Sequence, residues 1–395
     1  MAGERFTLRW GIMATGAMSE YFCKDLLTNP DIRGVTDVAH TITAVSSSND
    51  AKKAEDFLAR INHPSPSDVS TYGSYASLVQ DCNVDIIYIA TPHSHHFQNA
   101  MLALQASKNV LCEKALTVTA EQTRRLYETA RDRNLFFLEG VWTRFLPLSI
   151  KIRQLVRSGA IGQVYRVTAD LSRANSSKEP ASTRLDYEDS HRMVNPSLAG
   201  GVLLGLGIYS LTWVFQILYH LQPEAEKEKP HILSAVHKYA TGIDESTTIL
   251  LNFPGHGTTG IATSSLRIAT DPGSTGNPAI RIQGTAGEIQ VEHPAYKPLA
   301  FKLIKTTSDA AVEEAFECPQ PQDVERNWGN GTYWEADESA RCIRDGRLES
   351  SIMPWSESIL IMETMDHVMN QADITYPELI ASHDFDPSSP LNTGN

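Results

Sequence analysis

The sequence lacks most of the features that mark secreted, membrane or nucleic-acid-binding proteins. Its five cysteines are scattered and form no C-x-x-C pair, which is typical of reduced thiols rather than of a disulfide framework. Lys and Arg number 34 against 47 Asp and Glu, and a net charge of -13 argues against binding to the phosphates of nucleic acid. The first residues contain no apolar stretch of the signal-peptide type. We therefore expect a cytoplasmic protein with no nucleic acid or membrane partner.

One segment is uncharged over enough residues to cross a bilayer. From Leu198 to Gln222 there is no Asp, Glu, Lys or Arg. The segment contains four glycines (Gly200, Gly201, Gly205 and Gly207) and several polar residues, and no second segment resembles it. We expect a buried helix that the chain enters through a glycine-rich turn.

Strand-like and helix-like patterns alternate over the first 140 residues. The expected strands are Leu8–Met13, Thr41–Ser46, Val84–Ala90, Asn109–Cys112 and Phe136–Glu139. The expected helices are Ala17–Leu27, Ala51–Arg60, a stretch from Tyr75, Phe97–Ala106 and Ala120–Asp132. Strands joined by helical crossovers imply βαβ units and a doubly wound parallel sheet, an α/β domain of the Rossmann type over residues 1–147.

After Pro147 the pattern changes to short strands separated by Gly and Pro. Following a helix at Leu148–Ser158, the expected strands are Gly162–Ala169, His231–Ala240, Thr247–Phe253, Gly257–Ser265, Ala279–Gln283 and Gly287–Glu292. Helices are expected at Tyr333–Arg344 and Ser356–Asn370. This predicts a second, α+β domain over residues 148–370 with a large open, mostly antiparallel sheet. Residues 371–395 are expected to form a polar tail.

The first strand leads into a turn suited to a dinucleotide. The turn reads Ala14-x-Gly16-x-x-Ser19, an imperfect match to G-x-G-x-x-G, but it stands ahead of four more βα-type repeats. A helix N-terminus presents amide donors to pyrophosphate, and glycine lets the backbone come close. The cofactor contacts expected here are Gly11, Thr15, Gly16, Ala17 and Met18.

The end of the second strand favours NADP over NAD. An NAD site places an acid there against the ribose 2′-hydroxyl, whereas this chain has Ser47, Ser48 and Asn49, followed by Asp50 and Lys52. The hydroxyls, the amide and the lysine are candidate contacts for a 2′-phosphate. The alternative is a Ser-rich loop that only caps the next helix.

Two further loops follow strand ends on the edge of the sheet where ligands bind. Thr91, Pro92, His93 and His96 follow the third βα strand of the pattern and are candidate cofactor contacts. Glu113 and Lys114 follow the next one; a lysine there is suited to positioning a substrate hydroxyl, although a surface ion pair is the alternative. The histidine spacing fits no usual zinc site, so no metal is expected.

Several motifs, in order along most of the chain, carry a resemblance to a known family. They are Trp10-Gly-Ile-(x)3-Gly16, Ala90-Thr-Pro-His93, Glu113-Lys114, Glu139-(x)2-Trp-Thr-Arg144-Phe-x-Pro147, Gly159-(x)2-Gly162-x-Val164, Gly200–Tyr209, Tyr333-Trp-Glu-Ala-Asp337-Glu and Cys342-Ile-Arg-Asp-Gly346. The chain resembles the Gfo/Idh/MocA oxidoreductases, especially the members that oxidise D-xylose or aromatic dihydrodiols.

The resemblance implies an enzyme that transfers hydride to NADP and a homodimer formed through the open sheet. It places Lys114 and Tyr209 at the catalytic centre, with Trp142 and Arg144 near the cofactor. The subfamily element Asp-x-Gly-x-Tyr falls on Gly205–Tyr209, so glycine stands where the acid is expected. Tyr209 is expected to act as general base, with the Lys114 ammonium stabilising its phenolate.

The segment 189–196 offers His191, Arg192 and Asn195 as hydrogen-bond partners for substrate hydroxyls, although a plain surface loop is the alternative. Because a sugar needs many such partners, we expect oxidation of a small sugar, D-xylose at C1 to D-xylonolactone. A trans-dihydrodiol of benzene is the second substrate. A non-enzymatic NADP-sensing regulator is the alternative of another class.

Overall fold

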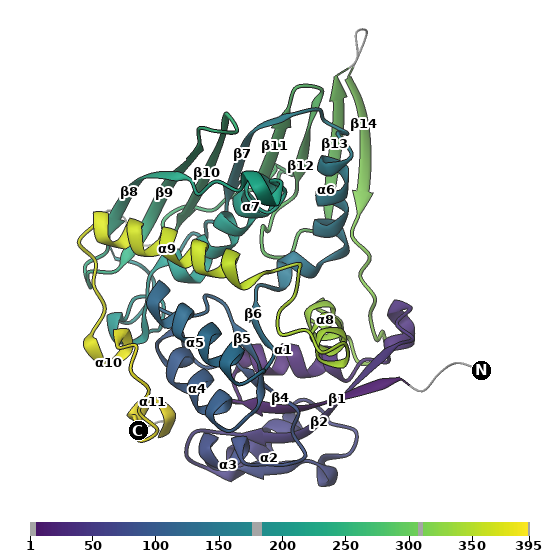
Figure 1. Cartoon of the computed structure of the whole chain (residues 1–395), viewed down its shortest axis with the longest axis vertical. Helices are drawn as coiled ribbons and strands as arrows, with labels where there is room; N and C mark the ends of the chain where they lie inside the picture. The colour runs from purple at the N-terminus through teal and green to yellow at the C-terminus, as the bar shows by residue number, and fades with distance from the viewer. Residues whose placement is uncertain (1–4, 176–183, 307–310, 394–395) are drawn as a thin grey trace.

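The computed structural model describes residues 5–175, 184–306 and 311–393. Two β-sheets lie one beyond the other along the long axis of the molecule, each with helices packed on it (Figure 1). The first sheet is built by the N-terminal part of the chain and the second by the middle part, so the expected order of an α/β domain and an α+β domain is confirmed.

The first sheet has six parallel strands in the order β3-β2-β1-β4-β5-β6. They are β1 Phe6–Met13, β2 Val38–Ser46, β3 Ser70–Tyr72, β4 Ile86–Ile89, β5 Asn109–Glu113 and β6 Phe137–Gly140. Strand β3 was not predicted, because three residues are too few to show a pattern. The order is that of a doubly wound Rossmann sheet, in which the carboxyl ends of β1, β4 and β5 meet at one edge.

Helices cover both faces of this sheet because its strand residues alternate between two apolar clusters. Trp10 and Ile12 pack with α1 (Ala17–Leu26) and α2 (Ala51–Arg60). Met13 and Ile87 pack with α3 (Tyr75–Val79), α4 (His93–Gln105) and α5 (Ala120–Asp132). The first cluster continues into the second domain, so the two domains share one core.

Helix α8 (Tyr333–Arg344) follows the second sheet in sequence but packs on α1, β1 and β2 of the first domain. Buried Asp25 of α1 accepts hydrogen bonds from the backbone N–H groups of Asn330, Gly331 and Thr332 at 2.7–2.8 Å, and from the Thr332 hydroxyl at 2.8 Å. These bonds hold the chain where it enters α8.

The second sheet has eight strands in the order β14-β13-β12-β11-β7-β10-β9-β8 and is antiparallel except between β7 and β10. They are β7 Val164–Asp170, β8 His231–Lys238, β9 Asp244–Phe253, β10 Thr258–Ser265, β11 Ile280–Gly284, β12 Gly287–Val291, β13 Ala300–Thr306 and β14 Ala311–Glu317. The six strands predicted for this sheet are present. The last two, β13 and β14, were missed.

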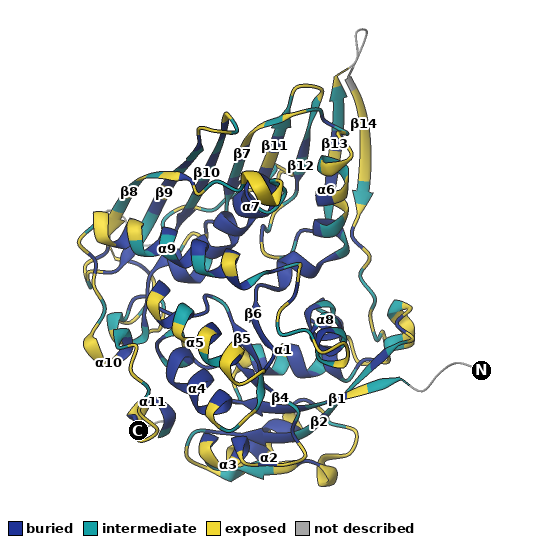
Figure 2. Ribbon diagram, in the orientation of Figure 1, coloured by how far each residue is buried: buried dark blue, intermediate teal, exposed yellow. Residues whose placement is uncertain are grey.

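One face of the second sheet is covered and the other is open. Helices α6 (Pro147–Arg157), α7 (Ile208–Leu218) and α9 (Trp355–Gln371) pack on the covered face (Figure 1). On the sheet's exposed strand positions, Leu233 of β8 is 65% exposed and Tyr165 of β7 is 48% exposed. Exposed positions alternate with others along β8 (Figure 2).

The uncharged segment is a buried helix, as predicted. In the described part of the chain, Pro196–Leu218 is the one helical stretch long and apolar enough to cross a membrane, and 89% of its most apolar window is buried. It contains a π-helical turn, η5 (Leu203–Gly207), before α7. The buried carboxylate of Asp244 accepts a hydrogen bond from the Leu203 N–H at 2.6 Å and so caps this turn.

The C-terminal segment, expected to be a polar tail, is docked on the first domain as far as residue 393. It contains α10 (Glu378–Ala381) and α11 (Pro390–Thr393), and both contact α4. Gln98 of α4 binds the backbone of Asp384, and Asn99 donates to Leu391 O at 3.0 Å. Gln122 of α5 donates to Ile380 O and Ser382 O, both at 2.8 Å.

Candidate functional site

The loop after β1 is open for a phosphate. Ala14 has a positive φ of 84°, and Gly16 caps α1 without any side-chain hydrogen bond. Among the described residues, a Cβ added to Gly16 would meet no atom within 4 Å, and the buried Ser19 hydroxyl has no partner. Uncapped amides and an unpartnered hydroxyl at a helix N-terminus fit a pyrophosphate. The residues of this turn therefore suit the dinucleotide that the sequence predicts.

The predicted contacts around this turn differ in their suitability. Thr15, Ala17 and Met18 lie on the turn and the first helical residues, partly or fully exposed. Gly11 lies inside β1, where a Cβ would come within 2.8 Å of Ile87 Cδ1, so packing against β4 is enough to explain the glycine without the predicted cofactor contact. Arg60, which sequence reasoning missed, donates to Thr15 O at 2.7 Å and lies beside this turn.

At the end of β2, several predicted groups are already engaged. The Ser47 hydroxyl donates to Asp50 O at 2.5 Å, and Asp50 caps α2 through the Lys52 N–H. The Lys52 ammonium lies near Glu55 and Asp56, directed along α2, so it does not support the predicted phosphate contact. Exposed Asn49 accepts from Lys53 Nζ at 3.0 Å, next to partly buried Ser48. Lys53 is thus the lysine that contacts the segment predicted to bind the 2′-phosphate.

The loop after β4 is tied to the loop after β5 by His96. Its fully buried ring places Nε2 2.9 Å from Thr91 O and Nδ1 3.0 Å from Ala115 O. His96 therefore braces the two loops, and these contacts do not support its predicted role as a cofactor contact. The Thr91 hydroxyl is buried without a partner among the described residues, and Pro92 is exposed at the start of α4. Both remain suited to a cofactor.

Lys114 is held at the carboxyl end of β5 against the helix that carries Tyr209. Its Nζ donates to Gly205 O at 2.7 Å and lies 4.6 Å from the centroid of the Tyr209 ring. Burial lowers the pKa of Lys114 to about 8, partly opposed by the negative charge of Glu113. Glu113 itself is buried and accepts from the Tyr88 hydroxyl at 2.7 Å, so it supports Lys114 from the core, and this contact does not support the predicted cofactor contact.

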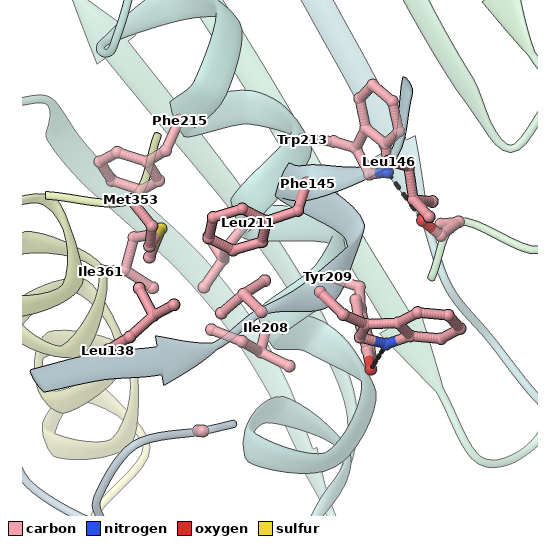
Figure 3. Close-up of a cluster of buried hydrophobic side chains, with 14 of the residues drawn as sticks. Leu138, Phe145, Leu146, Ile208, Tyr209, Leu211, Trp213, Phe215, Met353 and Ile361 are labelled. Atoms are coloured by element: carbon pink, nitrogen blue, oxygen red, sulfur yellow. Dashed lines mark hydrogen bonds between the residues drawn. The ribbon is translucent and has the colours of Figure 1, made fainter. Parts of the chain in front are cut away.

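Tyr209 meets Trp142, another predicted site residue. The Trp142 indole N–H donates to the Tyr209 hydroxyl at 3.0 Å (Figure 3), and the ring of Tyr296 lies 5.8 Å from that of Tyr209. Burial raises the pKa of Tyr209 well above its usual value, and the charge of Glu113 adds to this. Because Lys114 lies over the ring face rather than beside the hydroxyl, the expected phenolate stabilised by Lys114 is not what the geometry supports.

Arg144 is engaged in the protein core. It is fully buried, forms an ion pair with buried Glu357 of α9, and donates to Ile352 O at 2.6 Å. His220 Nδ1 lies 2.9 Å from the same carboxylate. Arg144 thus joins the loop after β6 to α9, and these contacts do not support the predicted cofactor contact.

The segment before η4 (Pro196–Leu198) faces Lys114, but only one of its three residues predicted to bind substrate acts on that lysine. His191 stacks on Tyr187 at 4.4 Å, and the Asn195 side chain caps η4 through the Ser197 N–H. Arg192 is close enough to lower the pKa values of Lys114 and His93. Of the three residues predicted to bind substrate, Arg192 is the one whose charge is felt at the catalytic lysine.

Two supporting residues were missed because their roles depend on long-range contacts. Buried Glu139 accepts from the Leu116 N–H at 3.0 Å and from the Ser358 hydroxyl at 2.7 Å, so it ties the Lys114 loop to α9. Met193 lies over Gly205, where an added Cβ would be 3.4 Å from Met193 Cε. A capping or packing role of this kind has no local sequence signal.

The arrangement thus combines a helix N-terminus open to pyrophosphate with a lysine of lowered pKa after β5 and a buried tyrosine on α7. This is the equipment of a nicotinamide-dependent oxidoreductase. The model of an oxidoreductase family with an NAD-binding Rossmann fold (GFO/IDH/MocA) matches residues 8–141, and that of its C-terminal domain matches residues 149–290. The chain belongs to the GFO/IDH/MocA family.

Curated relatives match along nearly the whole chain. A D-xylose 1-dehydrogenase (NADP(+)) of Hypocrea jecorina is 58% identical, with 100% of this chain and 99% of the relative covered. A trans-1,2-dihydrobenzene-1,2-diol dehydrogenase of Danio rerio is 32% identical, with 94% and 98% covered. Among solved structures, a levoglucosan dehydrogenase in complex with NADH and levoglucosan shares the fold at a TM-score of 0.76 and 17% identity, with 93% of this chain and 97% of that one covered.

Proposed function

We propose that the protein is an NADP-dependent D-xylose 1-dehydrogenase, which oxidises the C1 hydroxyl of D-xylose to D-xylonolactone. The observation that carries this is the Lys114–Tyr209 pair at the carboxyl end of β5, beside the open N-terminus of α1. The 58% identity over the whole chain to an enzyme of that activity supports the choice of substrate.

The residues of the site have separate roles in the reaction. When bound, the nicotinamide supplies the acceptor for the hydride that leaves C1. Lys114 and Tyr209 hold the substrate oxygen and manage its proton, and a positioned proton acceptor contributes roughly 10²–10⁴-fold to such a step. Arg192, on the segment facing Lys114, offers hydrogen bonds to the remaining sugar hydroxyls.

NADP is the cofactor that the β2 end supports. Ser48, Asn49 and Lys53 provide a hydroxyl, an amide and an ammonium there, and Asp50 is committed to capping α2. A phosphate is recognised by such donors, whereas a free ribose 2′-hydroxyl calls for a carboxylate.

A trans-dihydrodiol of benzene is the second candidate substrate, because aromatic rings line the site. The rings of Trp142 and Tyr209 lie 6.2 Å and 5.8 Å from that of Tyr296, centroid to centroid. Flat apolar surfaces of this kind suit an aromatic substrate. The dihydrodiol dehydrogenase relatives are consistent with it.

The test is formation of NADPH by the purified protein with NADP or NAD, against D-xylose, other aldoses and trans-benzene dihydrodiol. We expect the highest kcat/KM with D-xylose and NADP, and a loss of at least about 10²-fold in Lys114→Ala. Turnover of the dihydrodiol alone would favour the second substrate. Tight NADP binding without turnover of any substrate would refute the enzyme and favour a sensor.

We place the homodimer contact on the open face of the second sheet. Leu233 and Tyr165 expose large side chains on that sheet, and the helices α6, α7 and α9 occupy its other face. A stable dimer would bury such apolar groups. Light scattering should give twice the 43.6 kDa chain mass, and Tyr165→Glu with Leu233→Glu should give the monomer. We also expect the cytoplasm as its location.

A further inference from the structure

Lys114 has an unusual partner for a partly buried ammonium. Its one hydrogen bond within the described residues goes to the peptide oxygen of Gly205, and no carboxylate lies within salt-bridge distance of it there. A buried charge without a counter-ion is costly, and neutralisation is the usual response.

Gly205 can present this oxygen because it lies in the π-helical turn η5, where the hydrogen-bond pattern of the helix changes. Such turns often occur at functional sites. Gly205 does not need to be glycine for its backbone shape, since its φ is not positive. An added Cβ would meet only Met193 Cε at 3.4 Å and Sδ at 3.8 Å, so there is room for a side chain.

We propose that the peptide oxygen of Gly205 holds Lys114 in place of an acidic side chain, and that the free amine of Lys114 is therefore the base of the reaction. This rests on the proposed dehydrogenase function. In this step Lys114 Nζ takes the hydroxyl proton on its lone pair while the C1–O bond becomes a carbonyl; a bound oxidised nicotinamide would accept the hydride that C1 gives up. The resulting ammonium donates to Gly205 O and then returns its proton to water.

Tyr209 is the competing base, and its surroundings favour a different role. Its hydroxyl accepts the Trp142 indole N–H, and its ring packs under Lys114 Nζ. A neutral phenol so placed donates its proton in a hydrogen bond to the substrate oxygen. It thereby positions the substrate for Lys114.

The charged and titratable groups around Lys114 come from every element packed against it. Glu113 of β5 and Glu139 of β6 favour its ammonium form. Arg192 of the facing segment disfavours it, as do His93 and His96 of α4 when protonated. The balance lowers the pKa of Lys114 to about 8 from its ordinary 10.5. A carboxylate at position 205 would raise the pKa of Lys114 again.

The test compares Gly205→Asp with Gly205→Asn, which has the same shape without the charge. The pKa of Lys114 is measured by NMR of protein labelled at lysine Nζ, assigned with Lys114→Arg, and the acidic limb of kcat/KM is measured against pH. We expect both values to rise by roughly one to three pH units in Gly205→Asp and to stay within a few tenths in Gly205→Asn.

The two readouts separate the possible failures. A wild-type pKa for Lys114 near its ordinary 10.5 overturns the proposal even if the protein oxidises xylose. The proposal is also overturned if the acidic limb of kcat/KM does not move in Gly205→Asp, or if Tyr209→Phe is as inactive as Lys114→Ala. If the wild type oxidises no substrate but Lys114 titrates near 8 and shifts in Gly205→Asp, the Gly205 contact stands and the dehydrogenase function fails.

Discussion

Asp25 ties the cofactor helix α1 to the entry of α8, and its removal should measurably destabilise the protein. In Asp25→Ala the buried amides of Gly331 and Thr332 and the Thr332 hydroxyl lose their acceptor. An unsatisfied buried donor costs about 1–3 kcal/mol, so the two amides alone give roughly 2–6 kcal/mol.

Part of this loss is recovered. Burial raises the pKa of the Asp25 carboxyl in spite of its four hydrogen bonds, so removing the charge relieves a desolvation cost. We therefore expect a net decrease of about 2–4 kcal/mol in the free energy of unfolding at neutral pH. That is a large share of the stability of a typical domain.

Urea unfolding followed by tryptophan fluorescence measures this change. Asp31→Ala is the matched control, because the Asp31 side chain is 61% exposed and should alter stability by less than about 0.5 kcal/mol. If Asp25→Ala loses under about 1 kcal/mol, or no more than the control, the hydrogen bonds of Asp25 do not hold α8 as described.

Two other changes test the buried charges. Arg144→Met leaves Glu357 without its arginine and should lower the free energy of unfolding by about 3–5 kcal/mol. The folded protein should keep its affinity for NADP. A loss of NADP affinity without a loss of stability would instead support Arg144 as a cofactor contact. Burial raises the pKa of Asp244 to about 7 from 3.8, so the stability that its protonated form contributes is fully present below about pH 4 and is lost as pH rises from there through 7, by about 4 kcal/mol in all. Asp244→Asn should remove this trend, so the stability of the variant relative to wild type, measured by urea unfolding, should rise from pH 5 to pH 8. If the free energies of unfolding of the two proteins change in parallel with pH, the pKa of Asp244 is not raised.

The helices were predictable where local signals agree. Ala51–Arg60, Ala120–Asp132 and Tyr333–Arg344 were predicted to the residue. The first two begin where Asp50 and Thr119 accept backbone N–H groups, as capping residues do. Strands β13 and β14 were missed because charged residues interrupt their apolar pattern; these pair across the strands as Lys302 with Glu313 and Lys305 with Glu314. Such residues look like a polar loop in sequence.

The candidate site was predictable in its location but not in its contacts. Strand order brings the loops of Gly16, Thr91 and Lys114 to one edge, and this follows from the βαβ pattern. The burial of Arg144 depends on Glu357, 213 residues further along the chain, and no local pattern reveals such a pair. The Gly205 contact of Lys114 likewise arises from a backbone oxygen, which every residue type possesses.

The return of α8 and of the C-terminal segment to the first domain has a consequence for biosynthesis. The strands β1–β6 are synthesised before the helix that covers β1 and β2 and before the segment that binds Gln98, Asn99 and Gln122. A nascent chain therefore exposes part of the apolar surface of its first sheet until these later segments have left the ribosome. A chain that stops before them leaves the dinucleotide-binding domain incomplete.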